Sequence, residues 1–183
     1  MKYALIVGSL RKESLNRKLL SVIEKIINDQ KLGEIEVIDS NDIDLPLYNQ
    51  DIEDNGMPDK VNNITQKVIA ADALIISSPE YNGSISSPLK NTIDWISRHR
   101  PIPFNKLPIL MTGASPGRLG AMRGIAHAKI TFEALNSFVY PETFTLSKAN
   151  EAFNSDGELK DKDQFSRLES LVSDFHKFCE RIS

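Results

Sequence analysis

The chain has 183 residues, 40% of them hydrophobic and 26% charged, and its formal net charge is −3. This balance argues against a nucleic-acid binder, which usually shows a dominant basic face, and against an electron carrier that docks through one strong acidic patch. Because the chain has a single cysteine, an opening apolar run too short for a signal peptide and no apolar stretch of membrane length, we expect a cytoplasmic protein without disulfides or membrane contact.

Apolar periodicity predicts strands that alternate with helices. Tyr3 to Val7 form a continuous apolar run that ends at Gly8, which is typical of a strand buried on both faces. The first half of the chain then predicts, in order, a helix from Leu15 to near Gly33, a short strand over 35–38, a polar, turn-rich segment over 40–57 and a helix with Val61, Ile64 and Val68 on one face.

The second half continues this alternation. Pro88 suits the first turn of a helix that Ser86 or Ser87 would cap. Asp161 and Gln164 resemble a capping box before the last helix. The predicted elements are a strand over 73–76, the helix that begins near residue 88, a strand over 107–111, a helix over 121–135, a strand over 138–146 and a final helix that ends near residue 182.

Five strands alternating with helices predict an α/β fold, a flavodoxin-like three-layer sandwich around a five-stranded parallel sheet of order 2-1-3-4-5. We expect residues 1–183 to form a single domain. In this fold ligands bind beyond the carboxyl ends of the strands, at the switch between strands 1 and 3. The loops after strands 1, 3 and 4 should therefore lie side by side and form the ligand site.

The loop after the first strand, GSLRKESLN, places Ser9, Arg11, Ser14 and Asn16 just before a helix. A helix N-terminus has free N–H groups and a partial positive charge, so together with these donors it suits a phosphate monoester. The loop lacks the Gly-Lys-Ser/Thr of a P-loop and the glycines of a dinucleotide fingerprint. Taken alone, it favours an ordinary strand-to-helix turn with Ser14 as N-cap and a solvated Arg11.

The loop after the third strand, SPEYNGS, brings Pro79, Glu80, Tyr81, Asn82 and Gly83 to the same edge. A flat heteroaromatic ring needs backbone N–H and C=O groups nearby and an aromatic or apolar wall, and a loop bounded by proline and glycine supplies both. The alternative is a purely structural loop, in which Tyr81 covers the end of the sheet and Asn82 caps it.

The loop after the fourth strand, TGASPG, contains the G-x-S-x-G pattern of a hydrolase nucleophile elbow. That elbow forms its oxyanion hole partly from the N–H of the residue after the serine, and Pro116 has none. His127 and His176 follow at no spacing that marks either as a base, and no histidine pair has metal-ligand spacing. We therefore interpret Ser115 as a polar lip of the ligand site, with a small serine hydrolase as the weaker alternative.

At these three loops the sequence resembles the NADPH-dependent FMN reductase family, which includes quinone, chromate and azo-dye reductases. The motifs are GSLRKESLNRKL, PEYNGSISSPLKNTIDW and SPGRLGAMRG, with weaker likeness in LPLYNQD and FNSDGELKD. The family often has Ile-Pro-Gly where this chain has Ile85-Ser86-Ser87, and two glycines where it has Gly120-Ala121. The resemblance implies a flavodoxin-like fold, non-covalent FMN, NADPH or NADH as co-substrate, and a homodimer or homotetramer.

The resemblance also implies roles for individual residues. The first loop would hold the FMN phosphate, and the second and third would line the isoalloxazine. Hydride would pass from the nicotinamide to flavin N5 and then to a small acceptor such as a quinone, azo compound, flavin or metal oxyanion, without a catalytic side chain. Glu80 would be structural or paired across a subunit contact. A flavodoxin-type one-electron carrier is the alternative. The implied cofactor-binding residues are Ser9, Arg11, Ser14, Leu15, Asn16, Pro79, Glu80, Tyr81, Asn82, Gly83 and Ser115.

Overall fold

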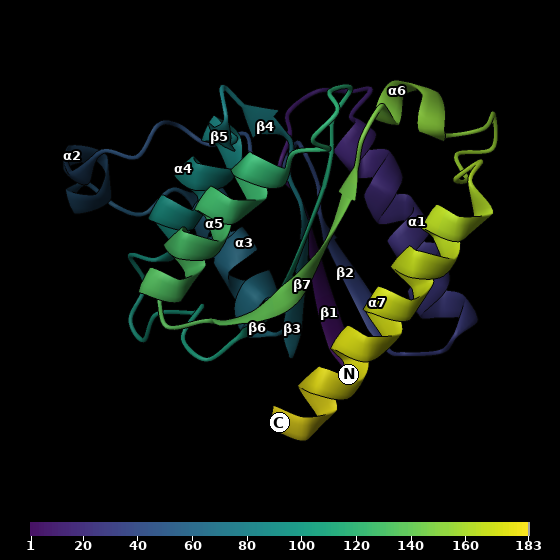
Figure 1. The fold of residues 1–183 in the computed structure, drawn as a ribbon. Helices are drawn as coiled ribbons and strands as arrows, with labels where there is room; N and C mark the ends of the chain where they lie inside the picture. The colour runs from purple at the N-terminus through teal and green to yellow at the C-terminus, as the bar shows by residue number, and fades with distance from the viewer. Residues whose placement is uncertain (183) are drawn as a thin grey trace.

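A computed structural model describes residues 1–182, and its centre is a five-stranded sheet between two layers of helices (Figure 1). The strands of this sheet are β1 (Lys2–Val7), β2 (Glu34–Ile38), β3 (Ala73–Ser77), β6 (Pro108–Ala114) and β7 (Phe138–Leu146). Their order is β2-β1-β3-β6-β7, and every neighbouring pair is parallel. This confirms the predicted flavodoxin-like order, because strands β4 (Glu80–Tyr81) and β5 (Ser84–Ile85) form a separate hairpin.

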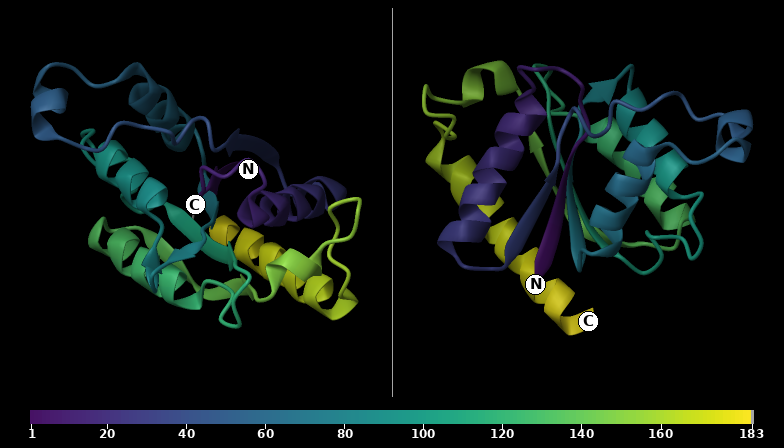
Figure 2. Two further views of the ribbon diagram at one scale, coloured as in Figure 1. Left: turned by 90° about the horizontal axis from the view of Figure 1, so that it is seen from above. Right: turned by 180° about the vertical axis from the view of Figure 1, so that it is seen from behind.

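Helices cover both faces of the sheet, as the two views in Figure 2 show. One face is covered by α1 (Leu15–Asp29) and α7 (Lys162–Ile182), and the other by α3 (Asp59–Ile69), α4 (Ser87–Ile96) and α5 (Met122–Ala134). Leu5 of β1 belongs to the first apolar core and Ile6 to the second, which is why β1 is apolar throughout. Within residues 1–182, no helix is both long enough and apolar enough to span a membrane.

Several short elements are missing from the sequence prediction. They are the β4–β5 hairpin, α2 (Gln50–Asp54) and α6 (Ala149–Ala152). The helix α2 buries no residue, so it has no apolar face from which a helix could be inferred. The strand β6 also continues beyond the predicted 107–111, because Thr112, Gly113 and Ala114 pair with β7 although none of them adds to a long apolar run. Polar and small residues thus carry the strand to the edge where the ligand site was expected.

Residues 40–58 form an arm that stands away from the three layers, with α2 near its tip (Figures 1 and 2). Its base is anchored on α4, where Trp95 Nε1 donates to the carbonyl of Pro46 at 2.8 Å and the rings of Tyr48 and Trp95 meet edge-on at 5.0 Å. The side chain of Leu47 is nevertheless 81% exposed. The arm is therefore fixed at its base while it presents an apolar side chain to the outside.

Candidate functional site

The three loops expected to form the site are held together by backbone hydrogen bonds at the carboxyl edge of the sheet. Gly8 N donates to Ser77 O at 2.8 Å, and Ser78 N donates to Thr112 O at 3.0 Å. These bonds join the start of the loop after β1 to the end of β3, and the start of the loop after β3 to β6. Gly113 allows the second approach, because a Cβ there would lie 2.7 Å from the carbonyl oxygen of Ser78. The prediction that these three loops lie side by side is confirmed.

A cavity of about 140 Å³ lies where these loops meet. The structure brings nine of the eleven predicted residues to its wall, together with Ala114 and Pro116. The nine are Ser9, Arg11, Ser14, Leu15, Asn16, Pro79, Glu80, Tyr81 and Ser115. Asn82 and Gly83 do not line it: they form the turn of the β4–β5 hairpin with φ of 50° and 77°. That turn needs residues which tolerate the left-handed region, and asparagine and glycine are the usual ones.

The first loop presents two buried hydroxyl groups beside the N-terminus of α1. Ser14 is the N-cap of α1 and accepts a hydrogen bond from Arg17 N at 3.3 Å, while Ser9 accepts one from Arg11 N at 3.3 Å. Both serines are only 3% exposed. The ordinary N-cap geometry and the anion site therefore coexist, since a hydroxyl that accepts from the backbone can still donate its own proton to a phosphate oxygen.

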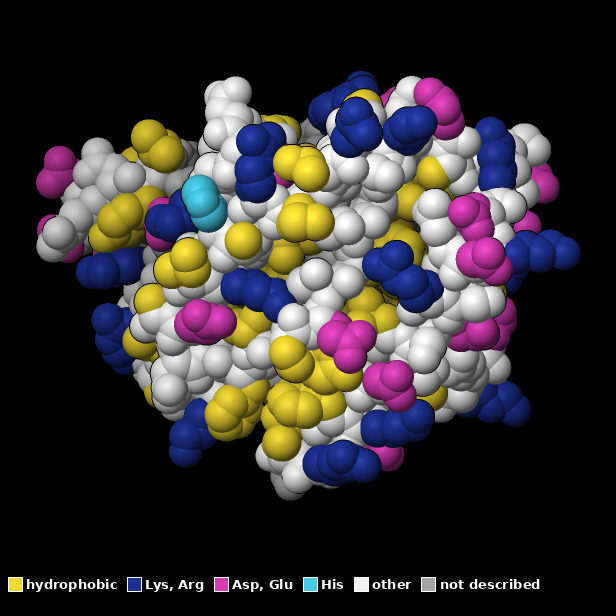
Figure 3. All heavy atoms as spheres, in the orientation of Figure 1, with side chains coloured by type: hydrophobic (Ala, Val, Ile, Leu, Met, Phe, Trp, Pro, Cys, Tyr) yellow, Lys and Arg dark blue, Asp and Glu magenta, His cyan; other side chains and the backbone are white. Residues whose placement is uncertain are grey.

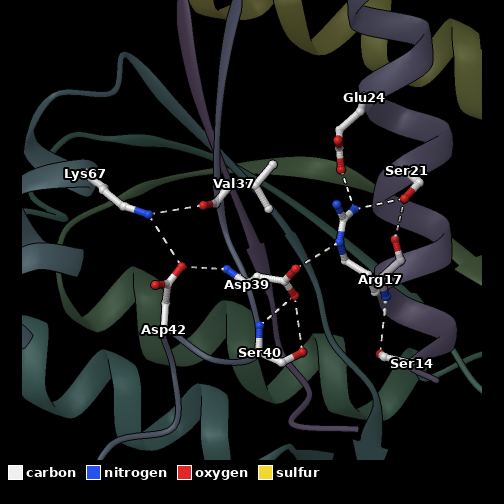
Figure 4. A network of polar contacts seen from close by, with 9 residues as sticks. All are labelled: Ser14, Arg17, Ser21, Glu24, Val37, Asp39, Ser40, Asp42 and Lys67. Carbon is white, nitrogen blue, oxygen red and sulfur yellow. Dashed lines mark hydrogen bonds and ion pairs between the residues drawn. The ribbon is translucent and has the colours of Figure 1, made fainter. Parts of the chain in front are cut away.

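Only one of the two arginines near this loop is available to a ligand. The guanidinium of Arg17 is engaged by Asp39 at 3.3 Å, by Glu24 and by Ser21 at 2.9 Å (Figure 4). The side chain of Arg11 is exposed and makes no hydrogen bond or ion pair with any residue in the described range 1–182. Arg11 is thus the arginine whose donors can reach an anion in the cavity.

Lys67 of α3 fixes the carboxyl end of β2, where the arm begins. Its ammonium group donates to Val37 O at 3.4 Å and contacts Asp42 at 3.5 Å (Figure 4). It also lies 3.0 Å from a carboxylate oxygen of Glu36. Together with the Arg17–Asp39 pair, these contacts tie the β2 end to α1 and α3 beside the first loop.

Asn16 has a second role that its sequence position did not reveal. Its Oδ1 accepts hydrogen bonds from Ala114 N and from Ser77 Oγ, both at 2.9 Å, and its Nδ2 donates to Ala114 O at 3.0 Å. The buried amide therefore joins the ends of β3 and β6 to the start of α1. One N–H of Nδ2 is left without an acceptor among residues 1–182, so the same side chain can tie the loops together and still donate to a ligand.

The hairpin that carries Glu80 is clamped by α5. Arg123 forms an ion pair with Glu80, with Nε at 2.8 Å, and the backbone N–H groups of Arg123 and Gly124 also donate to this carboxylate. Burial raises the pKa of Glu80, but these hydrogen bonds outweigh it and hold that pKa below its ordinary value. His127 adds a 2.9 Å contact with Ser84. Glu80 is thus paired with Arg123 within its own chain, which favours a structural role over a pair across a subunit contact.

Ser86 acts differently from the helix cap that the sequence suggested. It is the N-cap residue of α4 by position, yet its side chain makes no capping hydrogen bond. Instead its hydroxyl donates to Gly8 O at 2.6 Å and lies 3.4 Å from Ser78 Oγ. Ser86 therefore links the second loop to the first, a link that a residue without a hydroxyl, such as proline, could not make.

The structure gives no support to a serine hydrolase. Residues 116–121 separate Ser115 from α5, so the sharp strand-to-helix elbow of that enzyme class is missing. The two histidines considered as bases are engaged elsewhere, His127 with Ser84 and His176 with Tyr3 Oη at 2.6 Å. Within residues 1–182, Ser115 Oγ makes no hydrogen bond to a base, and Pro116 after it has no N–H to donate to an oxyanion.

The donor set fits a phosphorylated flavin. Two buried hydroxyls, the N-terminus of α1 and one unpaired guanidinium suit a dianionic phosphate, while Pro79 and Tyr81 supply the apolar and aromatic wall that a flat ring requires. Fold and cavity together define a flavodoxin-like domain with a candidate mononucleotide site at the switch between β1 and β3.

Comparison with known proteins narrows this class. The family model for NADPH-dependent FMN reductase matches residues 1–151. The chain is 32% identical over 186 residues to NADH:(hydroxy)cinnamate reductase subunit CrdA of Vibrio ruber, covering 100% of this chain and 89% of that one. It is 31% identical to a quinone reductase of Escherichia coli, covering 97% and 94%. The solved structure of FerB, a flavoenzyme NAD(P)H:(acceptor) oxidoreductase from Paracoccus denitrificans, is 30% identical with a TM-score of 0.85, covering 98% and 97%.

The chain therefore belongs to the NADPH-dependent FMN reductase family. This confirms the family, the oxidoreductase class and the use of FMN and NAD(P)H that the three loop motifs implied.

Proposed function

We propose that this protein is a cytoplasmic, single-domain NAD(P)H oxidoreductase that reduces a small acceptor, a quinone in the first place, through bound FMN. Azo compounds, free flavins and metal oxyanions are further acceptors of the same kind. The observation that carries the proposal is the cavity at the carboxyl edge of the sheet, where phosphate donors from one loop face a ring-binding wall from another. The names of relatives, which include a quinone reductase, support the acceptor class.

The residues divide into two groups by the part of FMN they would hold. Ser9, Arg11, Ser14, Leu15 and Asn16 would hold the phosphate, and the hairpin residues with Ser115 would line the ring. When bound, FMN accepts a hydride and passes two electrons on. The protein binds and orients the ring, and no side chain has to move a proton in the hydride step. Glu80 is committed to Arg123 and is therefore a positioning residue.

The shallow site favours alternating use by donor and acceptor. A cavity of about 140 Å³ is smaller than a typical small-molecule site and cannot enclose a whole flavin, so one ring face is left for both substrates. Tyr81, 39% exposed, stands at this opening. Donor and acceptor would then exclude each other, which gives ping-pong kinetics.

Two separate apolar surfaces support a homodimer or homotetramer. The arm presents Leu47 and Ile52, and a second patch over α5 and β7 includes Met122, Ile130 and Phe138 (Figure 3). The sheet edge beneath this patch is blocked to strand addition, because Lys129 Nζ donates to Tyr140 O and Pro141 O at 3.0 and 2.7 Å. Two distinct self-complementary contacts are what a dihedral tetramer needs.

Light scattering at micromolar protein should show a dimer or larger, and a monomer would contradict this.

Rapid mixing without oxygen tests the enzyme assignment. One equivalent of NADH or NADPH should bleach the flavin absorbance in a single two-electron step, and a quinone should restore it. A one-electron carrier with the same fold would react slowly with the nucleotide and would be reduced in two separate one-electron steps. Negligible bleaching by both nucleotides would overturn the reductase and favour the carrier.

A further inference from the structure

A second cavity, of about 510 Å³, lies away from the three loops, between α1, the loop that precedes α7 and the first turns of α7. We call it the α1 groove. None of the predicted flavin-binding residues lines it. Its volume falls within the roughly 300–1,000 Å³ of small-molecule sites, so its lining decides what it could bind.

The floor of the α1 groove is apolar. Val22 of α1 is 5% exposed and Leu159 is 8% exposed, and half-buried Phe165 closes the floor from the α7 side. An aliphatic or aromatic body can therefore replace water here, which is favourable in proportion to the apolar area removed from water.

The rim of the groove has more free positive than free negative charge. Lys18 on α1 and Lys162 on α7 are exposed, and neither side chain makes a hydrogen bond or ion pair within residues 1–182. Lys25 and Glu158 neutralise each other at 2.6 Å, which leaves Asp156 as the single unpaired acid of the lining. The two free ammonium groups come from the two helices that flank the groove.

The loop that forms one wall is already folded. Asn154 Oδ1 accepts hydrogen bonds from the backbone N–H groups of Asp156 and Glu158 at 3.0 and 2.9 Å, and Asn154 N donates to Glu158 O at 2.9 Å. A bridge between Phe153 and Leu159 closes the same turn. The loop is therefore ordered before a ligand binds, so binding costs little free energy for loop ordering.

We propose that the α1 groove is a second binding site, for a small amphipathic carboxylate whose apolar body lies on the floor and whose anionic group lies between Lys18 and Lys162. Charge complementarity and the formed apolar floor select this class of ligand over a neutral or cationic one. The site is independent of the flavin, because its lining and the flavin cavity share no residue.

Calorimetry on the FMN-loaded enzyme tests the site with 2-naphthoate and its neutral amide as probes. We expect the carboxylate to bind more tightly than the amide. Lys18→Ala and Lys162→Ala should each weaken the carboxylate by about two- to fivefold and leave the amide unchanged. The matched control is Lys177→Ala, an exposed lysine of the same helix α7 outside the groove, which should bind both probes like the unmodified enzyme.

Charge reversal sharpens the test, because Lys162→Glu should weaken the carboxylate more than Lys162→Ala does. The flavin content of every variant should stay unchanged, which separates the groove from the flavin site. Equal affinity for acid and amide, absence of binding at millimolar probe, or lysine variants that bind like the unmodified enzyme would each overturn the proposal.

Discussion

The α1 groove and the three-loop cavity rank in opposite order by volume and by the number of fixed polar donors that line them. The α1 groove is the larger, at about 510 Å³, but its unpaired charged groups are the exposed side chains of Lys18, Lys162 and Asp156. The three-loop cavity measures only about 140 Å³, yet buried hydroxyls, a buried amide and a helix N-terminus converge on it. Volume alone would favour the groove as the cofactor site, whereas the fixed donors favour the loops, where we propose that FMN binds. Buried donors cost free energy to desolvate, so their convergence at one point is the better marker of a cofactor.

The largest effect should come from Asn16, because it holds the three-loop cavity together. Asn16→Leu leaves the buried N–H and C=O of Ala114 without partners, which should lower the free energy of unfolding by about 2–4 kcal/mol. Urea denaturation of the FMN-free protein measures this. Asn28→Leu, at an exposed position of the same helix, is the control and should change little.

If Asn16→Leu and Asn28→Leu have equal effects, the amide does not tie the strands together. The cavity would then be an incidental hollow, with no more internal order than the groove.

A smaller effect is expected at Arg123, which holds the hairpin from outside the cavity. Arg123→Ala should weaken FMN by about three- to tenfold at pH 7, because the charged clamp on Glu80 is lost. Since the pKa of Glu80 is depressed, the clamp is present above the ordinary pKa of a glutamate and disappears as the pH falls through the depressed value. FMN binding titrations at pH values between 4 and 7 measure both the loss of affinity at pH 7 and its pH dependence.

In Arg123→Ala, Glu80 loses its main partner while burial still raises its pKa, so its carboxylate is protonated at a higher pH. FMN affinity should therefore begin to fall at a higher pH than in the unmodified protein. Arg118→Ala removes an exposed neighbouring arginine that has no ion pair within residues 1–182, and it should keep the original profile. Superimposable profiles for Arg123→Ala and the unmodified protein would show that the clamp does not act on the flavin site.

The smallest effect on FMN affinity should come from Ser86, which links the loops after β1 and β3. Ser86→Ala leaves Gly8 O without its 2.6 Å donor and should cost about 1–2 kcal/mol of unfolding free energy, with FMN affinity reduced by only a few-fold. Thermal denaturation and FMN titration measure the two quantities. Ser166→Ala, an exposed serine on α7, is the control. Unchanged stability in Ser86→Ala would mean that water replaces the hydroxyl.

The sheet order and the set of cavity residues were predictable from the sequence for a physical reason. Buried parallel strands are continuously apolar, as in β1 and β3, and polar residues directly after them fall at one edge by topology. Nine of the eleven predicted residues line the cavity, because a residue's place after a strand decides this without knowledge of its contacts.

The contacts that organise the site were not predictable in this way. Glu80 and Arg123 are 43 positions apart, and Ser86 and Gly8 are 78 apart. No local spacing signals such pairs, because the first forms only when α5 packs on the hairpin and the second only when the loops after β1 and β3 meet. The hydrogen bonds of Asn16 to β3 and β6 were not predicted, because they depend on neighbours that are distant in sequence. The helix α2 was not predicted, because it has no apolar face.

The most direct test compares FMN with riboflavin, which differ only in the phosphate. Arg11→Ala, in the three-loop cavity, should weaken FMN by roughly 10- to 150-fold and hardly affect riboflavin, since a charge-assisted hydrogen bond to phosphate is lost. Lys162→Ala, in the α1 groove, should leave the affinities for both flavins within about twofold, because an exposed charge distant from the ligand is screened. If Arg11→Ala weakened both flavins equally, or if Lys162→Ala reduced FMN affinity more than Arg11→Ala did, the phosphate would not lie at the three loops.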